Sequence, residues 1–198
     1  KADVTKTLDG LDGKVDGAFS QGEGQARKKF EDYVGQRMDA YKEDRYGGFF
    51  GPAKWLKDKL MGMPGEVNQF YADGKTRYLA DMDGVIGKIA DIVGTGLNAA
   101  RARIAQGKAE IAKYVAQLPQ DLKKVGQEAQ DKLQSQFDQL ESDVESKQSE
   151  MVDTLARKYV ESRDALDARI DEMKAANRGL IDKAMDAIAG VIKTIIQL

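Results

Sequence analysis

"VNQFYADGKTRYLADMDGVIGKIADIVGTGLNAARARI", residues 67–104, carries the pattern that decides the fold. Uncharged residues recur along it at steps of 4, 3 and 4 positions, beginning with Val67, Tyr71, Gly74 and Tyr78. This spacing places them on one face of an α-helix, because three helical turns hold about 11 residues. The stretch therefore predicts a long helix with a narrow apolar stripe, which suits a seam against partner helices.

The same count continues to Ile195 without meeting a charged residue, and only Gln148, Ser162 and Asn177 on it are polar. These three either fix the register between helices or mark places where the seam is open to water. The amino-terminal part follows the same rule, with Arg37 as its one charged interruption. Its stripe positions are Val4, Leu8, Leu11, Val15, Phe19, Gly22, Ala26, Phe30, Tyr33 and Tyr41.

Glycine and proline divide this stripe into helices, expected at about residues 2–45, 52–62, 66–117 and 120–198. Pro119 marks either a turn or a kink in one long helix. We expect the turn, because a lone helix cannot bury its own stripe. The predicted fold is all-α: an elongated antiparallel bundle or coiled coil of three long helices and one short connector helix. It forms a single domain over 1–198, expected to be a fragment of a longer chain.

Composition narrows the chemistry that the chain could perform. Charged residues make up 32% and nearly cancel, for a net charge of −2, which argues against nucleic acid as a partner. The absence of histidine and cysteine removes His-based catalysis, thiol nucleophiles and zinc sites built on those residues. We therefore expect no enzyme, no cofactor and no metal site.

The segment "RYGGFFGPAKWLKDKLMGMPGEVNQFY", residues 45–71, differs from its surroundings in holding the only tryptophan and two prolines. Its aromatic and lysine side chains form the candidate interaction or capping tip: Tyr46, Phe49, Phe50, Lys54, Trp55, Lys57 and Lys59. We predict that the aromatics cap the open end of the bundle. The alternative is a tip that recognises a partner protein or a lipid surface.

Three motif-like features are interpreted as structural. Gly94, Gly96 and Ala99 match a dinucleotide fingerprint, which requires a preceding strand that the sequence does not predict. Two aspartate- and glycine-rich stretches lack the glutamate of an EF-hand. The carboxylates clustered near Asp167 and Glu172 lie off the stripe among basic residues and predict a solvated face with weak ion pairs.

Glycines on or beside the stripe lower helix propensity by roughly 0.5–1 kcal/mol each. Two interpretations stay open: close approach of another backbone, or helices that unfold easily. The glycines concerned are Gly74, Gly84, Gly87, Gly94, Gly96, Gly107 and Gly126.

The segment 45–71, "VGQEA" at 125–129 and "DALDARIDEMKAANRGLIDKAMDAIAGVIKTI" at 164–195 resemble the helical middle region of large multidomain bacterial proteins. Those proteins are associated with extracellular contractile injection systems, which are phage-tail-like particles. The resemblance implies a non-catalytic structural or spacer segment of a secreted cargo or accessory protein. It would be made in the bacterial cytoplasm and would act with an extracellular particle.

The partners expected are therefore other domains of the parent protein or components of the particle. A membrane surface is disfavoured, because the stripe is narrow and flanked by charges of both signs. The apolar "IAGVIKTIIQL" at 188–198 predicts self-association.

Overall fold

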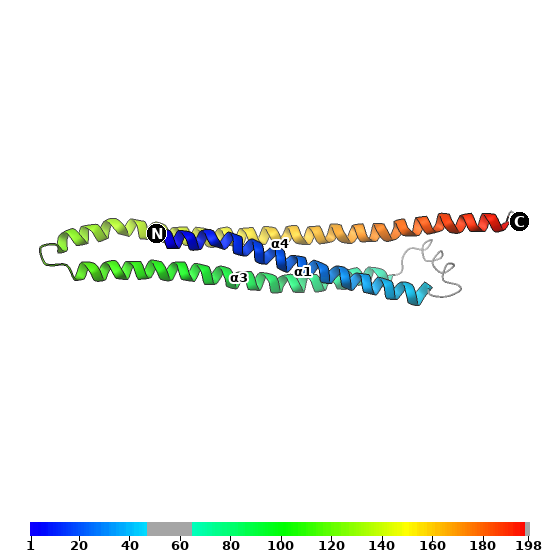
Figure 1. The fold of residues 1–198 in the computed structure, drawn as a ribbon, viewed down its shortest axis with the longest axis horizontal. Coiled ribbons are helices and arrows are strands. Elements are labelled where there is room, and N and C mark those ends of the chain that lie inside the picture. Colours follow the sequence, from blue (N-terminus) through cyan, green and yellow to red (C-terminus); the bar gives the residue numbers. More distant parts are fainter. Residues whose placement is uncertain (47–64, 197–198) are drawn as a thin grey trace. The chain divides into compact units, whose positions relative to one another are not determined.

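The computed structural model describes residues 1–46 and 65–196, with the side chains of 1–44 and 65–176. Three helices make up nearly all of this part of the chain: α1 (Ala2–Tyr46), α3 (Gly65–Ala116) and α4 (Lys123–Ile196) (Figure 1). These residues contain no strand, so the prediction of an all-α protein is confirmed. The short helix predicted over 52–62 lies outside the described residues.

The connection between α3 and α4 is a turn built around Pro119. The N–H groups of Leu122 and Lys123 donate to the Pro119 carbonyl at 2.9 and 3.1 Å, which starts the first turn of α4. Because proline disfavours helical geometry at the residue before it, α3 ends a few residues earlier. Beyond the turn α4 returns along α3, and Lys108 pairs with Glu141 at 2.7 Å. Of the two alternatives at Pro119, the structure has the turn.

The helices contribute to two compact units. Unit 1 comprises Lys1–Gly22 and Asp83–Tyr159, and unit 2 comprises Glu23–Met82 and Val160–Leu198.

In unit 1, α1 lies antiparallel to α3 and parallel to α4. These directions follow from Asp3–Arg103 and Gly22–Val85 between α1 and α3, and from Asp12–Lys147 and Asp16–Lys158 between α1 and α4.

Unit 2 is also built from all three helices. Its contacts are Glu23–Tyr78 and Tyr41–Phe70 between α1 and α3, Glu31–Arg169 between α1 and α4, and Lys75–Asp167 between α3 and α4.

The core of each unit consists mainly of stripe residues from the three helices, with Leu97, Val34 and Met38 buried beside the predicted stripe. Unit 1 buries Val4, Leu8, Leu11, Val15, Phe19, Ile89, Val93, Leu97, Ala100, Ile104, Leu140, Val144 and Met151. Unit 2 buries Ala26, Phe30, Val34, Met38, Val67, Tyr71, Tyr78, Met82, Leu166 and Ile170. Burial of these side chains supplies the main driving force for packing the helices.

The buried face of α1 departs from the predicted stripe after Phe30. The sequence predicts Tyr33, Arg37 and Tyr41 on the seam, whereas the structure buries Val34 and Met38 and leaves Arg37 exposed. Successive steps of four residues advance the buried positions around the helix, because four residues exceed one helical turn. That part of the prediction is wrong, and the shift removes the one charged interruption from the seam.

Some stripe glycines provide room for a large side chain of a neighbouring helix. A Cβ atom at Gly96 would lie 2.5 Å from Leu11 Cδ2, and one at Gly74 would lie 2.9 Å from Phe30 Cε2. One at Gly107 would lie 3.2 Å from Phe137 Cε1. The close approach is therefore made by side chains, not by another backbone as predicted.

The glycines beside the stripe behave differently. Nothing lies within 4 Å of a Cβ atom placed at Gly84, Gly87 or Gly94. The close-approach interpretation is wrong for these three positions. The interpretation that they weaken the helix stays a prediction.

The hairpin end of unit 1, defined as residues 105–139, contains only α3 and α4. Figure 1 shows this end extending past the amino terminus of α1. The stripe residues Ile111, Val115, Leu133 and Phe137 are only half-buried here. The pattern of the sequence is unchanged, but the third helix is missing from this part of the unit.

Candidate functional site

The predicted tip lies almost entirely in a part of the chain that the structure does not describe. The chain segment 47–64, which holds most of its residues, lies outside the described residues, and so does the side chain of Tyr46. The cap and the recognition tip both stay predictions.

The most buried polar cluster of the described residues lies in unit 2, around Tyr78. The phenol is 1% exposed and donates a hydrogen bond to Glu23 Oε1 at 3.2 Å. Arg27 lies one helical turn after Glu23 and donates to the same oxygen from Nε and Nη2, at 2.9 and 2.6 Å. The hydroxyl of Ser162, which is also buried, hydrogen-bonds the phenol from α4. One tyrosine therefore connects all three helices.

The protonation of this cluster is set by its surroundings. Burial raises the pKa of Tyr78 far above its usual value, and the negative charge of Glu23 and the hydrogen bond to it raise this pKa further. Arg27 and Ser162 act in the opposite direction without offsetting the effect. The phenol therefore keeps its proton over the whole physiological range and acts as a permanent hydrogen-bond donor. A buried donor of this kind fixes the register of helices, because a shifted register would leave it unsatisfied.

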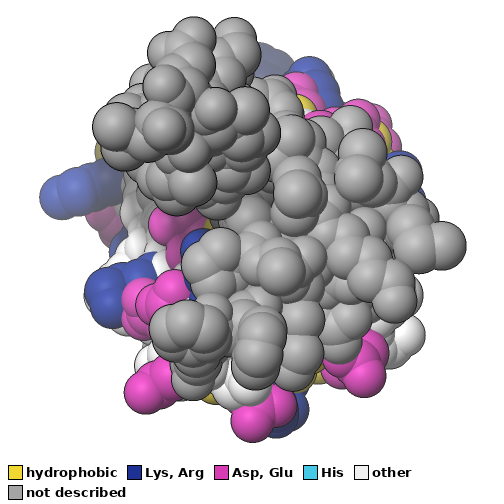
Figure 2. All heavy atoms as spheres, turned by 90° about the vertical axis from the view of Figure 1, so that its right-hand side faces the viewer, with side chains coloured by type: hydrophobic (Ala, Val, Ile, Leu, Met, Phe, Trp, Pro, Cys, Tyr) yellow, Lys and Arg dark blue, Asp and Glu magenta, His cyan; other side chains and the backbone are white. Residues whose placement is uncertain are grey.

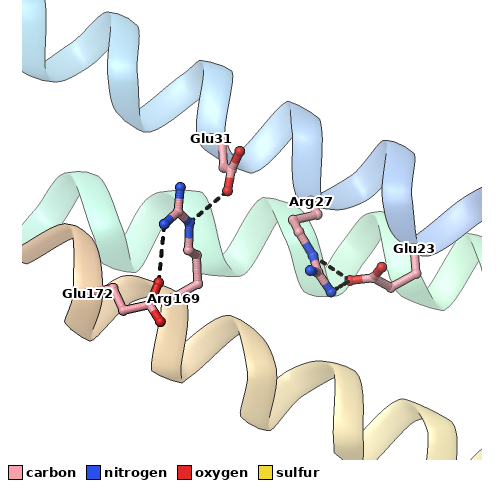
Figure 3. A network of polar contacts seen from close by, with 5 residues as sticks. All are labelled: Glu23, Arg27, Glu31, Arg169 and Glu172. Atoms are coloured by element: carbon pink, nitrogen blue, oxygen red, sulfur yellow. Dashed lines mark hydrogen bonds and ion pairs between the residues drawn. The ribbon is translucent and has the colours of Figure 1, made fainter.

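A second polar contact in unit 2 joins α1 to α4. Arg169 Nε donates to Glu31 on α1 at 2.8 Å, and Arg169 Nη1 donates to Glu172 on its own helix at 3.2 Å (Figure 3). The hydrogen bond to Glu31, followed by that to Glu172, raises the pKa of Arg169. Figure 3 also shows the Glu23–Arg27 pair on α1.

In unit 1 the contacts between α1 and α4 use lysines. Lys147 Nζ donates to Asp12 at 2.8 Å and to Glu150 on its own helix at 3.1 Å. Burial lowers the pKa of Lys147, but the hydrogen bonds to Asp12 and Glu150 outweigh it, so the net shift is upward. Lys158 pairs with Asp16 at 3.0 Å and lies 5.7 Å from the centre of the Phe19 ring.

Sequence reasoning missed the role of these cations, although a signal for it exists. Lys147, Lys158 and Arg169 are each 11 residues apart and each pairs with a carboxylate of α1. The carboxylates near Asp167 and Glu172 are exposed and ion-paired, as the predicted solvated face requires, and one of them, Asp167, pairs with Lys75 of α3 at 2.5 Å. Basic residues that recur every 11 positions beside the stripe could have predicted ion pairs with a neighbouring helix.

The polar residues on the stripe have different surroundings. Gln148 is exposed and accepts a hydrogen bond from Arg101 at 2.8 Å. Ser162 is buried beside Tyr78. The side chain of Asn177 lies outside the described residues. Gln148 therefore marks a place where the seam is open to water, whereas Ser162 is buried in the seam.

The described surface carries exposed basic and acidic side chains together with a few exposed large hydrophobic residues. On the face drawn in Figure 2, the coloured side chains are mainly basic and acidic and are mixed together. Within residues 1–44 and 65–176, no group of three or more acidic side chains is placed to hold a metal ion. None of the described helices is long and apolar enough to cross a membrane.

Comparison with known proteins identified no relative of this chain. No protein-family model matches the sequence. Searches of curated proteins and of solved structures likewise gave no match.

Proposed function

We propose that this chain is a non-catalytic helical packing module, an antiparallel coiled-coil bundle whose seam follows an 11-residue hydrophobic repeat. It serves as a structural or spacer segment of a larger protein associated with bacterial contractile injection systems. The three stretches quoted above support that setting by resemblance. The partners are other domains of the same protein or components of the particle.

The non-catalytic part of this proposal is supported by the most covered polar side chains, which contact other helices of the same protein. The buried Tyr78 contacts Glu23 of α1 and Ser162 of α4, and the largely covered Lys147 of α4 donates to Asp12 of α1. A catalytic group must reach a substrate and change its protonation or bonding at working pH. Tyr78 instead holds its proton firmly inside the seam.

The rival function is binding to a lipid surface, and vesicle flotation tests it. Interfacial helices need a broad apolar face for the membrane, whereas most stripe residues in the three-helix parts of both units are buried. We expect the protein to stay at the bottom of the gradient with vesicles of phosphatidylcholine and of phosphatidylserine. Flotation with either vesicle at physiological salt would contradict the packing module.

Association with a particle needs a separate experiment. A tagged form of the chain, produced in bacteria that assemble a contractile injection particle, should sediment with the particles in a density gradient. A tagged helical protein of similar size serves as the control. Recovery of the chain only in the soluble fractions would remove the injection-system setting and leave the packing module intact.

A further inference from the structure

Two arginines of unit 2 stack on the ring of Tyr33. Arg37 lies one helical turn after Tyr33 on α1, and its guanidinium carbon is 5.5 Å from the ring centre. Arg77 comes from α3, and its guanidinium carbon is 4.5 Å from the same centre. Both arginines are exposed, whereas the tyrosine is half-buried. Because the face of an aromatic ring attracts cations, Tyr33 holds the two guanidinium groups near each other.

The position of Tyr33 follows from the shift of the buried face of α1. Because Val34 fills the core in its place, Tyr33 is displaced from the seam toward α3. Lys29 lies one turn earlier on the same side of α1 and pairs with Asp81 of α3 at 3.1 Å. Arg37, the one charged residue on the predicted stripe, is exposed beside the ring. The residues that interrupt the repeat thus form a polar cluster at the edge between α1 and α3.

The guanidinium groups of Arg37 and Arg77 have no ion pair or hydrogen bond within residues 1–44 and 65–176. Five other arginines bond a carboxylate or an amide of the protein: Arg27, Arg101, Arg103, Arg163 and Arg169. Two carboxylates lie one turn from Arg77 on α3, but Asp73 accepts from Gln69 and Asp81 pairs with Lys29. Both stacked arginines therefore keep their N–H donors for a ligand.

The shared ring limits how far apart the two guanidinium groups can be. The two distances from the ring centre add up to 10.0 Å, which is the largest possible separation of the guanidinium carbons. Each guanidinium presents a planar fork of N–H donors that matches two oxygens of an oxyanion. A carboxylate fills one fork with its two oxygens, whereas the oxygens of a phosphate group can meet two forks at once. The pair therefore favours a phosphate group over a carboxylate.

The charge at this edge sets the expected strength of binding. Lys29 and Asp81 neutralise each other, and Asp73 offsets one of the two stacked arginines. These five side chains, Lys29, Arg37, Asp73, Arg77 and Asp81, carry a formal net charge of +1. Attraction at an exposed site of this charge is screened by salt, so the directed N–H donors must supply the selectivity. We expect weak but selective binding.

We propose that Arg37 and Arg77 form a binding site for a phosphate group, with Tyr33 as the platform that orients both side chains. The same contacts suit inorganic phosphate and the phosphate ester of a larger ligand. The site does not depend on the proposed structural function or on the injection-system setting.

Nuclear magnetic resonance of the arginine side chains tests the site in the full chain. Titration with inorganic phosphate at constant ionic strength should shift the Nε–H signals of Arg37 and Arg77 with one shared Kd in the millimolar range. Arg77→Lys should raise the Kd measured on Arg37 about fivefold or more, because lysine keeps the charge and loses the fork. Arg101→Lys is the control on the same helix and should leave the Kd unchanged, since Arg101 is bonded to Gln148.

Two substitutions at Tyr33 separate its ring from its hydroxyl. Tyr33→Phe should keep the Kd, because the ring face remains. Tyr33→Leu should raise the Kd about threefold, because the guanidinium groups lose the face that orients them. Circular dichroism must show that each variant keeps the helical content of the wild type. Wild-type binding by Tyr33→Leu would overturn the role of the ring as a platform.

Other anions identify the source of the phosphate. Tighter binding of O-phosphoserine than of inorganic phosphate would support a phosphate ester on a larger ligand, and the reverse order would support the free ion. Acetate should bind about fivefold more weakly than phosphate or worse. Equal binding of acetate and phosphate, or no shift of either arginine up to about 50 mM phosphate, would overturn the proposal. Equal Kd values for Arg77→Lys and Arg101→Lys would do the same.

Discussion

Ile89 and Ile111 lie two repeats apart on the same face of α3, yet their surroundings differ. Ile89 is 0% exposed among three helices, whereas Ile111 lies half-buried in the hairpin end, where α1 is absent. Both belong to unit 1. The periodic pattern therefore determines which face of a helix is apolar, but the number of neighbouring helices determines how deeply that face is buried. Matched residues in the two surroundings allow this difference to be measured.

The largest effect is expected from the isoleucines themselves. Ile89→Ala should lower the free energy of unfolding by about 2–5 kcal/mol, because it removes buried methyl groups and leaves a cavity. Ile111→Ala should lower it by about 1 kcal/mol or less, since less apolar surface is lost from burial. Urea denaturation at low protein concentration measures both. Equal losses would show that the hairpin end is as well packed as the three-helix region.

A pair of tyrosines tests the polar part of the seam. Tyr78→Phe should lower the free energy of unfolding by about 1–2 kcal/mol, because the substitution removes the hydrogen bond that the buried phenol donates to the partly buried Glu23. Tyr114→Phe, at the exposed hairpin end, should change it by less than about 0.5 kcal/mol. The comparison fails if Tyr78→Phe unfolds at the same urea concentration as the wild type.

The Tyr78 hydroxyl should also leave a signature in the pH dependence of stability. Its pKa is raised in the folded protein, so its contribution is fully present below the ordinary tyrosine pKa of about 10. The contribution is lost as the pH rises above that value toward the folded pKa, because only the unfolded chain then releases this proton. The stability difference between wild type and Tyr78→Phe should shrink above pH 10. A difference that stays constant to pH 11 would contradict the upward shift.

Two glycines one repeat apart give a smaller contrast. At Gly96 an added methyl group would meet Leu11, which is buried in the core, and overpacking of this kind costs about 1–3 kcal/mol. The gain in helix propensity, about 0.5–1 kcal/mol, offsets only part of it. At Gly107 the nearest side chain is the half-buried Phe137, which has room to shift. Gly96→Ala should therefore be destabilising and Gly107→Ala neutral or slightly stabilising in thermal denaturation.

Gly94 supplies the control for this pair, because nothing lies within 4 Å of a Cβ atom there. Gly94→Ala should stabilise the protein by about 0.5–1 kcal/mol through helix propensity alone. A stabilising Gly96→Ala would show that the Leu11 side chain does not need the space that the glycine leaves.

The smallest effects are expected from two lysines. Lys147 is largely covered and joins α4 to α1, so Lys147→Ala should cost about 1 kcal/mol. Lys108 joins α3 to α4 in the hairpin end and is more exposed, so Lys108→Ala should cost about 0.5 kcal/mol or less. High salt should weaken the Lys108 effect more, because exposed pairs are screened more strongly. Indistinguishable values at low and high salt would contradict this ranking.

Much of this fold was predictable because it rests on local chemistry. The 4-3-4 count identified Ile89, Ile104 and Val144 as seam positions, and all three are buried. Pro119 marked the position of a turn or kink, because proline acts on its immediate neighbours. The count failed at Val34 and Met38, where the buried face moves by steps of four and a fixed repeat loses its phase.

The contacts between distant residues could not be predicted in the same way. The period of Lys147, Lys158 and Arg169 is visible in the sequence, but their α1 partners depend on the relative register of two helices. The cluster of Glu23, Tyr78 and Ser162 depends in the same way on three helices. A single sequence predicts which face of each helix is apolar, but it does not predict how the helices are aligned with one another.

Hydrogen exchange tests most directly whether burial follows the number of packed helices. In unit 1, residues 83–104 of α3 face α1 and α4, and residues 105–116 face α4 alone. The backbone amides of 105–116 should exchange much faster than those of 83–104, because local opening there exposes less buried surface. Equal protection along both stretches of the same helix would contradict the account.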